Sequence, residues 1–184
     1  MNAYGTALFT HFLGLVGLFV GYGLEWSASS LLRGSTTSDQ AISWLRVYRL
    51  SLPISGPSLL ILILSGGYMA SVTGAWKQGW ISASLLALLV VLAVGFAMVL
   101  PRVKNLRAAL PERPAALEDR SLARVQDPML ATLIRTRFVL ALGIVYLMTA
   151  KPASLSTSLL ILLGAVAIGL LASLSAWTSI PKIR

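Results

Sequence analysis

The chain is organised around the stretch AYGTALFTHFLGLVGLFVGYGLEWSASSLL, residues 3–32, which contains a single acid and a single histidine. An apolar run of about 20 residues or more is typical of a membrane-spanning helix, because its backbone polar groups must be satisfied within the segment. The sequence therefore predicts an all-α, polytopic membrane helix bundle, a four-helix core plus a fifth C-terminal transmembrane helix, in one integral membrane domain, 1–184. The other four predicted spans are at about 52–73, 80–100, 128–150 and 155–178.

The composition excludes several kinds of site. Hydrophobic residues make up 57% of the chain and charged residues 11%, whereas a soluble domain has about 25% charged residues. The absence of cysteine excludes disulfides, zinc–thiolate sites, iron–sulfur clusters and covalently attached haem. The single histidine excludes a multi-histidine metal site within one protomer. The sequence contains no Walker loop, HExxH motif or dinucleotide fingerprint, and no inverted repeat of the kind found in transporters.

The positive charges are distributed unevenly between the predicted spans. With five spans, Lys77 and Lys151 fall on one side, and the other 13 of the 15 lysines and arginines fall on or near the opposite side. The positive-inside rule places the richer side in the cytoplasm. We therefore expect a bacterial inner membrane protein with a periplasmic N-terminus, a cytoplasmic loop at 102–127 and a cytoplasmic C-terminus. The basic residues on the cytoplasmic side of the lipid bilayer then account for the net charge of +9, and no nucleic-acid partner is expected.

Prolines set the expected interruptions of the helices. Pro53 and Pro57 predict a bent or irregular start to the second span, preceded by a short interfacial helix at 41–50. Pro101 predicts the end of the third span, and an amphipathic helix is expected at 115–126 in the following loop.

One face of the first span carries an unusual set of residues. Positions three and four apart lie on one stripe of a helix, which here contains Tyr4, His11, Gly14, Leu18, Gly21 and Glu25. Glycines allow two membrane helices to approach closely, which is their ordinary role. The alternative is that Gly14 leaves room for a flat cofactor beside His11.

Three hypotheses account for His11: an axial haem ligand, a proton-handling group, or a hydrogen-bonded polar residue between helices. Haem iron is the only metal considered, because Glu25 lies about 21 Å from His11 along a helix and cannot share a metal with it. Met69 and Met148 end the second and fourth spans in the same outer layer as His11, and each is a candidate second ligand of haem b. A symmetry-related His11 across a dimer axis is the other candidate.

Glu25 is the only acid within an apolar run, so it needs a partner of opposite charge. The uninterrupted apolar core of the fourth span covers only 138–150, which places Arg135 and Arg137 within the inner leaflet. A structural ion pair between Glu25 and one of these arginines is the favoured interpretation. The alternative is that the arginines hold haem propionates or anionic lipid headgroups.

Four motifs resemble a known family. They are HFLGLVGLFVGYGLEW at 11–26, LSGGYMA with W..GWI at 64–81, PRVKNL at 101–106 and VYLMTAKP at 145–152. Over about 1–152 the chain resembles the bacterial integral membrane family designated domain of unknown function 2269. That family is similar in layout to the copper-resistance CopD-like and protoporphyrinogen-oxidase-like membrane proteins, and this likeness implies that His11 ligates haem. The chain differs from those proteins in its fifth span and in having no second histidine.

Two functions remain open from the sequence. The working prediction is non-covalent binding of haem b for electron transfer or redox chemistry, with His11, Gly14, Met69 and Met148 as the cofactor site. The other is a non-catalytic accessory or scaffolding subunit of a larger membrane protein complex, which the small number of buried polar groups favours. In either case we expect a homo-oligomer or a subunit of a membrane complex.

Overall fold

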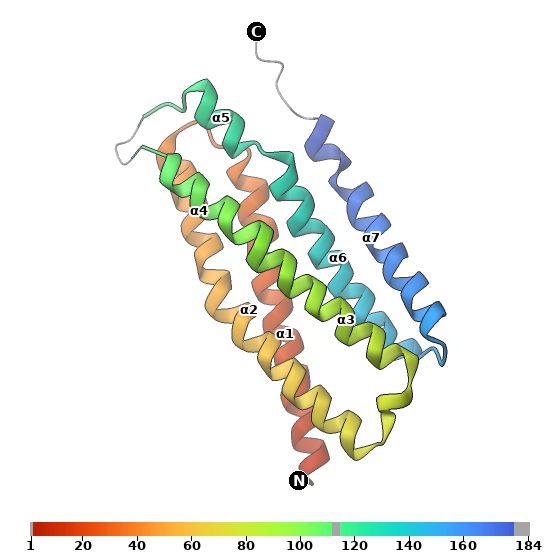
Figure 1. Cartoon of the computed structure of the whole chain (residues 1–184). Helices are drawn as coiled ribbons and strands as arrows, with labels where there is room; N and C mark the ends of the chain where they lie inside the picture. The colour runs from red at the N-terminus through yellow and green to blue at the C-terminus, as the bar shows by residue number, and fades with distance from the viewer. Residues whose placement is uncertain (1, 112–114, 179–184) are drawn as a thin grey trace.

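The computed structural model describes residues 2–111 and 115–178, which form a bundle of long helices joined by short loops (Figure 1). The helices are α1 (Ala3–Leu32), α2 (Ser38–Val72), η1 (Ala75–Lys77), α3 (Gly79–Val94), η2 (Gly95–Val99), α4 (Leu100–Ala109), α5 (Asp119–Val125), α6 (Pro128–Ala150) and α7 (Leu155–Thr178). Because α3, η2 and α4 follow one another without a break, the described chain has 5 helical segments long and apolar enough to cross a membrane. The predicted all-α membrane bundle is confirmed.

Three spans begin and end where the sequence predicted. The predicted ranges 3–32, 128–150 and 155–178 match α1, α6 and α7. Capping residues lie at the start of two of these helices. The Asn2 side chain accepts a hydrogen bond from the Gly5 amide at 2.8 Å, and the Asp127 side chain accepts one from the Met129 amide at 2.9 Å. Each cap satisfies an amide that has no partner inside its helix, so each fixes a helix start.

The second span differs from the prediction, because α2 continues without interruption through Pro53 and Pro57. It also includes the segment that was expected to form a separate interfacial helix. Each proline removes one amide donor, a loss that side chains and small adjustments compensate in membrane helices. The hydroxyl groups of Ser55 and Ser58 donate to the Ser51 and Ile54 carbonyls at 2.9 and 2.7 Å, whereas the carbonyls that lose an amide donor are those of Arg49 and Pro53.

The third span also continues beyond its predicted end at Pro101. The helix widens into the π-helical turn η2, in which the Leu100 amide donates to the Gly95 carbonyl. α4 then begins with Pro101 in its first turn and extends to Ala109. Proline fits the first turn of a helix because the amide that it lacks has no helical partner there. The wide turn therefore lets the chain stay helical through Pro101.

The loop between α4 and α6 contains a shorter helix than the one predicted at 115–126. The chain before α5 is extended along the start of α2. The Ser38 amide donates to the Ala115 carbonyl at 2.9 Å, and the Leu117 amide donates to the Thr36 carbonyl at 3.0 Å. These bonds hold the residues before α5 in an extended conformation, so the helix starts after them.

The helices pack as a four-helix core with one helix on its edge. In Figure 1, α1 and α2 form an antiparallel pair, α3 and α6 pack beside them, and α7 lies on the outer edge against α6. One end gathers the ends of α1 and α7, the beginnings of α2 and α6, and the helices α4 and α5. We call it the basic end, because every described lysine and arginine except Lys77 and Lys151 lies in the half of the bundle next to it. Arg113, Lys182 and Arg184 lie outside the described residues.

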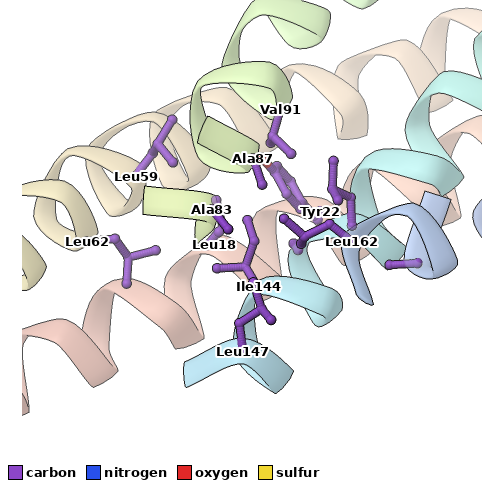
Figure 2. Packing of buried hydrophobic residues seen from close by; sticks show 13 residues of the cluster. Leu18, Tyr22, Leu59, Leu62, Ala83, Ala87, Val91, Ile144, Leu147 and Leu162 are labelled. Carbon is purple, nitrogen blue, oxygen red and sulfur yellow. The ribbon is translucent and has the colours of Figure 1, made fainter. Parts of the chain in front are cut away.

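Apolar side chains fill the bundle in two buried clusters. The first, shown in Figure 2, joins five helices and includes Leu18, Leu59, Ala87, Ile144 and Leu162. The second lies toward the basic end and includes Ala28, Leu45, Val99, Val125 and Ile134. Along α1, α2 and α6, the positions between the two clusters are Glu25, Ser51 and Arg137. A polar layer therefore separates two apolar ones.

Candidate functional site

A buried ion pair occupies the layer between the two apolar clusters. Arg137 Nη1 of α6 donates a hydrogen bond to Glu25 Oε2 of α1 at 3.0 Å. Glu25 is 2% exposed and the Arg137 side chain is 11% exposed. Because both groups have lost their hydration, each stabilises the charged form of the other. Of the two arginines that the sequence placed near Glu25, Arg137 is the one that pairs with it.

Hydroxyl-bearing side chains surround the ion pair. Ser51 Oγ of α2 lies 3.2 Å from Glu25 Oε1, and its closer acceptor is the Tyr48 carbonyl at 2.7 Å. The guanidinium carbon of Arg137 lies 4.9 Å from the centroid of the Tyr22 ring, which is a cation–π distance. Ser51, Tyr22 and Tyr48 are all buried. We call these five residues the polar cluster; it connects α1, α2 and α6.

A glycine makes room for the arginine of the polar cluster. A Cβ atom at Gly95 would lie 2.9 Å from Nη2 of Arg137, closer than Cβ atoms approach other groups in proteins. Gly95 is also the first residue of the π-helical turn η2. Such turns occur frequently at functional positions of helices. Here the turn brings the backbone of the third span directly against the charged group.

Arg135 contacts α7 instead of Glu25. Its Nη1 donates to the Ala172 carbonyl at 3.0 Å and to Ser175 Oγ at 3.1 Å. Arg33, which follows α1, donates from Nη2 to the Ala176 carbonyl at 2.6 Å. Two guanidinium groups thus meet the C-terminal turns of α7, where the helix dipole favours positive charge. These contacts attach the fifth helix to the four-helix core.

Arg33 also links α1 to the segment before α6. Its Nη1 donates to the Gln126 carbonyl at 2.5 Å. Burial and the nearby Arg135 guanidinium lower the pKa of Arg33 from its ordinary value, and the Asp127 carboxylate acts in the opposite direction. Arginine stays protonated in proteins, so Arg33 joins these segments as a charged donor.

His11 lies on the same stripe of α1 as Glu25 but has a different environment. Its Nδ1 is 3.0 Å from Ser65 Oγ of α2. The Ser65 hydroxyl donates to the Ile61 carbonyl at 2.5 Å. Since a serine hydroxyl has one hydrogen, we assign His11 Nδ1 as the donor to Ser65 and Nε2 as the nitrogen with the lone pair. The half-buried ring therefore forms a polar link between α1 and α2.

The space beside His11 does not fit a haem within the chain. A Cβ atom at Gly14 would lie 2.9 Å from Ile61 Cγ2 and 3.1 Å from the Ser58 carbonyl. One at Gly66 would lie 3.1 Å from His11 Cε1. Helix α2 thus fills the side of α1 where room for a flat cofactor was expected. On its Nδ1 side, the imidazole faces α2 of its own chain.

The two methionines considered as second haem ligands have other surroundings. Met69 is half-buried near the end of α2, where its carbonyl accepts a hydrogen bond from the Thr73 hydroxyl at 2.7 Å. Met148 packs against the apolar cluster of Figure 2. Within residues 2–111 and 115–178, no polar contact joins either sulfur to His11. Haem b binding remains a prediction from the family likeness, without a matching set of donors in the described chain.

The glycines of α1 bring its backbone close to α2. A Cβ atom at Gly17 would collide with Ser58 Oγ. One at Gly21 would lie 2.7 Å from Ser55 Cβ and 3.1 Å from the Ser55 amide nitrogen. This small-residue interface is the ordinary close packing that the glycine pattern indicates in membrane helices.

Sequence reasoning missed several partners of the candidate residues. Ser51 and Ser65 belong to a series of α2 serines spaced three, four and seven residues apart, and this recurrence is the pattern that would have located the face of α2 toward α1. Tyr22, Tyr48 and Gly95 belong to no such pattern. Their role depends on which helices meet, because Arg137 approaches them from α6.

The fold and the polar cluster define the chain as a multi-pass integral membrane protein with an ion pair inside its bundle. Residues 7–152 match the family described as predicted integral membrane protein, domain of unknown function 2269 (DUF2269), and the chain belongs to this family. The resemblance stated from the motifs is confirmed, whereas the likeness to CopD-like proteins stays an expectation. No curated protein and no solved structure matched the chain. Helix α7 lies beyond the matched residues.

Proposed function

We propose that the protein is a non-catalytic accessory or scaffolding subunit of a larger membrane protein complex. The observation that carries this proposal is how the buried polar groups are used. Glu25 and Arg137 neutralise each other between helices, and His11 is hydrogen-bonded between α1 and α2. Polar groups whose partners lie inside the protein stabilise the packing of its helices, as a scaffold requires.

The attachment of the fifth helix supports the same proposal. α7 is held by Arg33 and Arg135, and its outer face is apolar, with Leu160, Leu163 and Leu171 each more than 60% exposed. A firmly attached helix with such a face has the surface that packs against lipid or against another membrane helix. In a complex, this face contacts the partner.

Photo-crosslinking in intact membranes tests the proposal. A photoreactive residue would replace, one at a time, an exposed side chain on each outer helix: Val16, Leu64, Leu89 or Leu171. We expect one position to give a discrete product with another protein and the other positions to give lipid adducts. Lipid adducts at all four positions would contradict the subunit proposal.

Absorbance spectroscopy separates this proposal from haem binding. The full chain, purified in detergent and mixed with haem b, is expected to show no stoichiometric Soret band, because α2 fills the space beside His11. A stoichiometric band that disappears in a His11→Ala variant would replace the subunit proposal with the haem one.

We also infer a bacterial inner membrane location, with a periplasmic N-terminus and a cytoplasmic C-terminus. The support is the charge distribution, since Lys77 and Lys151 are the only 2 of 15 lysines and arginines assigned to the periplasmic side. Reporter fusions ending at Lys77 and at Lys151 should act as periplasmic, and a fusion at Arg120 as cytoplasmic. A cytoplasmic result at Lys151 would refute this orientation.

A further inference from the structure

Two hollows lie next to each other at the basic end. The first is a groove of about 410 Å³ among α3, α6 and α7, with Val94, Leu133, Leu170, Leu174 and Trp177 in its walls. We call it the apolar groove. The second is a hollow of about 770 Å³ between α4 and the segment from α5 to α6, with Arg102, Asn105 and Arg124 in its walls. We call it the basic hollow.

The two hollows follow one another along the helix axes. Pro128 lines the basic hollow, and its neighbour Met129 lines the apolar groove. On the other wall, Val94 of the groove and Arg102 of the hollow belong to one continuous helical segment and lie about 12 Å apart along it. A single elongated molecule can therefore occupy both, with its polar part in the basic hollow.

The apolar groove has the chemistry of a lipid-chain site. Its leucines come from α6 and α7, and the exposed side chains of Leu170 and Leu174 leave it open to the membrane. Thr136 and Arg137 also line the groove, but their unpartnered Oγ1 and Nε atoms are not accessible to solvent, so the surface that the groove offers is mainly apolar.

The basic hollow has the charge that a phosphate group needs. Arg102 uses Nη1 to donate to the Met98 carbonyl at 2.9 Å, and Arg124 is exposed. Asp127 also lines the hollow, but its Oδ1 accepts the Met129 amide and caps α6. The hollow is therefore positive overall, with two arginines and one carboxylate.

We propose that the basic hollow and the apolar groove together bind one anionic glycerophospholipid. Its phosphate lies between Arg102 and Arg124, and one acyl chain lies in the groove against Leu170 and Trp177. Arginine recognises phosphate through paired N–H donors, and basic pockets between membrane helices bind anionic headgroups. The proposal concerns a lipid site and does not depend on the subunit role.

Native mass spectrometry of the full chain in detergent tests the headgroup site. The probes are phosphatidylglycerol and phosphatidylcholine with the same acyl chains. We expect tighter binding of phosphatidylglycerol, weakened about 5-fold for each arginine removed, in the variants R102Q and R124Q. The matched control is the pair R107Q and R120Q, because these exposed arginines lie on the same two helices but outside the hollow.

A groove-filling variant and a soluble competitor test the chain site. L170W fills the groove from an exposed position and should weaken the binding of both lipids. Glycerol phosphate lacks acyl chains and should not displace phosphatidylglycerol.

Three results would overturn the proposal. They are equal affinity for the two lipids, an equal loss of phosphatidylglycerol affinity in R102Q and R124Q and in the control variants R107Q and R120Q, or full displacement of phosphatidylglycerol by glycerol phosphate. If the double variant R102Q/R124Q does not fold, the exposed Arg124 alone, as R124Q, gives the same comparison with R120Q.

Discussion

The two ends of the bundle are held together by different interactions. At the basic end, side chains join segments that are far apart in the sequence. Arg33 reaches Ala176, Arg135 reaches Ala172, and the Ser38 hydroxyl accepts the amide of a residue in the loop after α4. These bonds attach the end of α1 and the start of α6 to α7, and the start of α2 to the loop after α4.

At the opposite end, most described side-chain hydrogen bonds are local. Trp76 Nε1 donates to Ser71 Oγ at 3.0 Å, five residues away. The link between His11 and Ser65 is the long-range exception. Close backbone contact takes the place of charged links there, since a Cβ atom at Gly79 would collide with the backbone at the start of α7.

The comparison shows where a membrane bundle uses charge. An arginine near the end of a span keeps part of its hydration, so a bond from it to another helix costs little. Glu25 and Arg137 are the deepest charged groups among the described residues, and they have no such access. Their stabilising effect therefore depends on each other, which makes the pair the most sensitive point of the structure.

The largest effect is expected from breaking the ion pair. Arg137→Gln leaves the Glu25 carboxylate buried without a counter-charge, which typically costs about 3–5 kcal/mol of stability. Chemical or thermal unfolding in detergent measures this loss. The control is Arg49→Gln, at an exposed position of α2.

A double variant sharpens that result. Glu25→Gln with Arg137→Gln removes both charges, so it should be more stable than Arg137→Gln alone. If Arg137→Gln and the exposed control lose the same stability, the pair does not stabilise the bundle.

A smaller effect is expected from detaching α7. Arg135→Gln removes the two hydrogen bonds that Nη1 donates to the last turns of α7, and because these bonds are exposed to solvent the expected loss is about 1.5–3 kcal/mol in total. Hydrogen exchange should become faster in α7 and remain unchanged in α1. Faster exchange spread evenly over all helices would show that Arg135 stabilises the bundle as a whole.

The close packing of α1 and α2 can be tested with two glycines of the same helix. Gly21→Ala places a Cβ atom 3.1 Å from the Ser55 amide nitrogen, and such overpacking costs about 1–3 kcal/mol. Gly23→Ala is the matched control, because nothing lies within 4 Å of its Cβ position. Unfolding in detergent should separate the two variants, and equal stabilities would contradict the tight interface.

The smallest effect is expected at His11. His11→Leu removes one hydrogen bond in a half-buried position, worth about 0.5–1.5 kcal/mol. Ser65→Ala should cost a similar amount, and the double variant should cost less than the sum of the two. Additive losses would show that the two side chains do not interact.

The sequence predicted the spans well where the apolar run and the helix end coincide. α6 begins after the cap Asp127, at the point where the apolar pattern begins, so its range was predicted correctly. Pro53 and Pro101 misled the prediction, because α2 stays helical through Pro53 and the wide turn places Pro101 in the first turn of α4, where proline removes no helical bond.

For the candidate site, the sequence predicted the depth of the charged residues in the membrane but not which side chains meet. Arg135 and Arg137 share that layer, but positions two apart point about 200° away from each other on a helix. Which of them meets Glu25 depends on the rotation of α6 against α1, and this rotation is set by packing with helices distant in the sequence. The contact between Gly95 and Arg137 could not be predicted for the same reason, because the two residues belong to different helices.

The π-helical turn in the third span also controls the phase of its buried face. Five buried residues of this span recur at multiples of four positions, namely Ala83, Ala87, Val91, Val99 and Val103, whereas the buried residues Ser84 and Leu106 lie outside this series. In a regular α-helix, each step of four overshoots a full turn by about 40°, so from Ala83 to Val103 the buried positions would wind about 200° around the axis. A wide turn holds one extra residue and removes about 100° of that drift.

The wide turn therefore lets the third span hold one more residue than a regular α-helix of the same phase. Deleting one residue within Gly95–Val99 would remove that extra residue, restore a regular α-helix and leave the faces of the following residues unchanged. Val103 and Leu106 would then stay toward the bundle, and the wide turn that brings Gly95 against Arg137 would be lost. The third span can thus lose a residue at this turn without changing which side of α4 faces the protein.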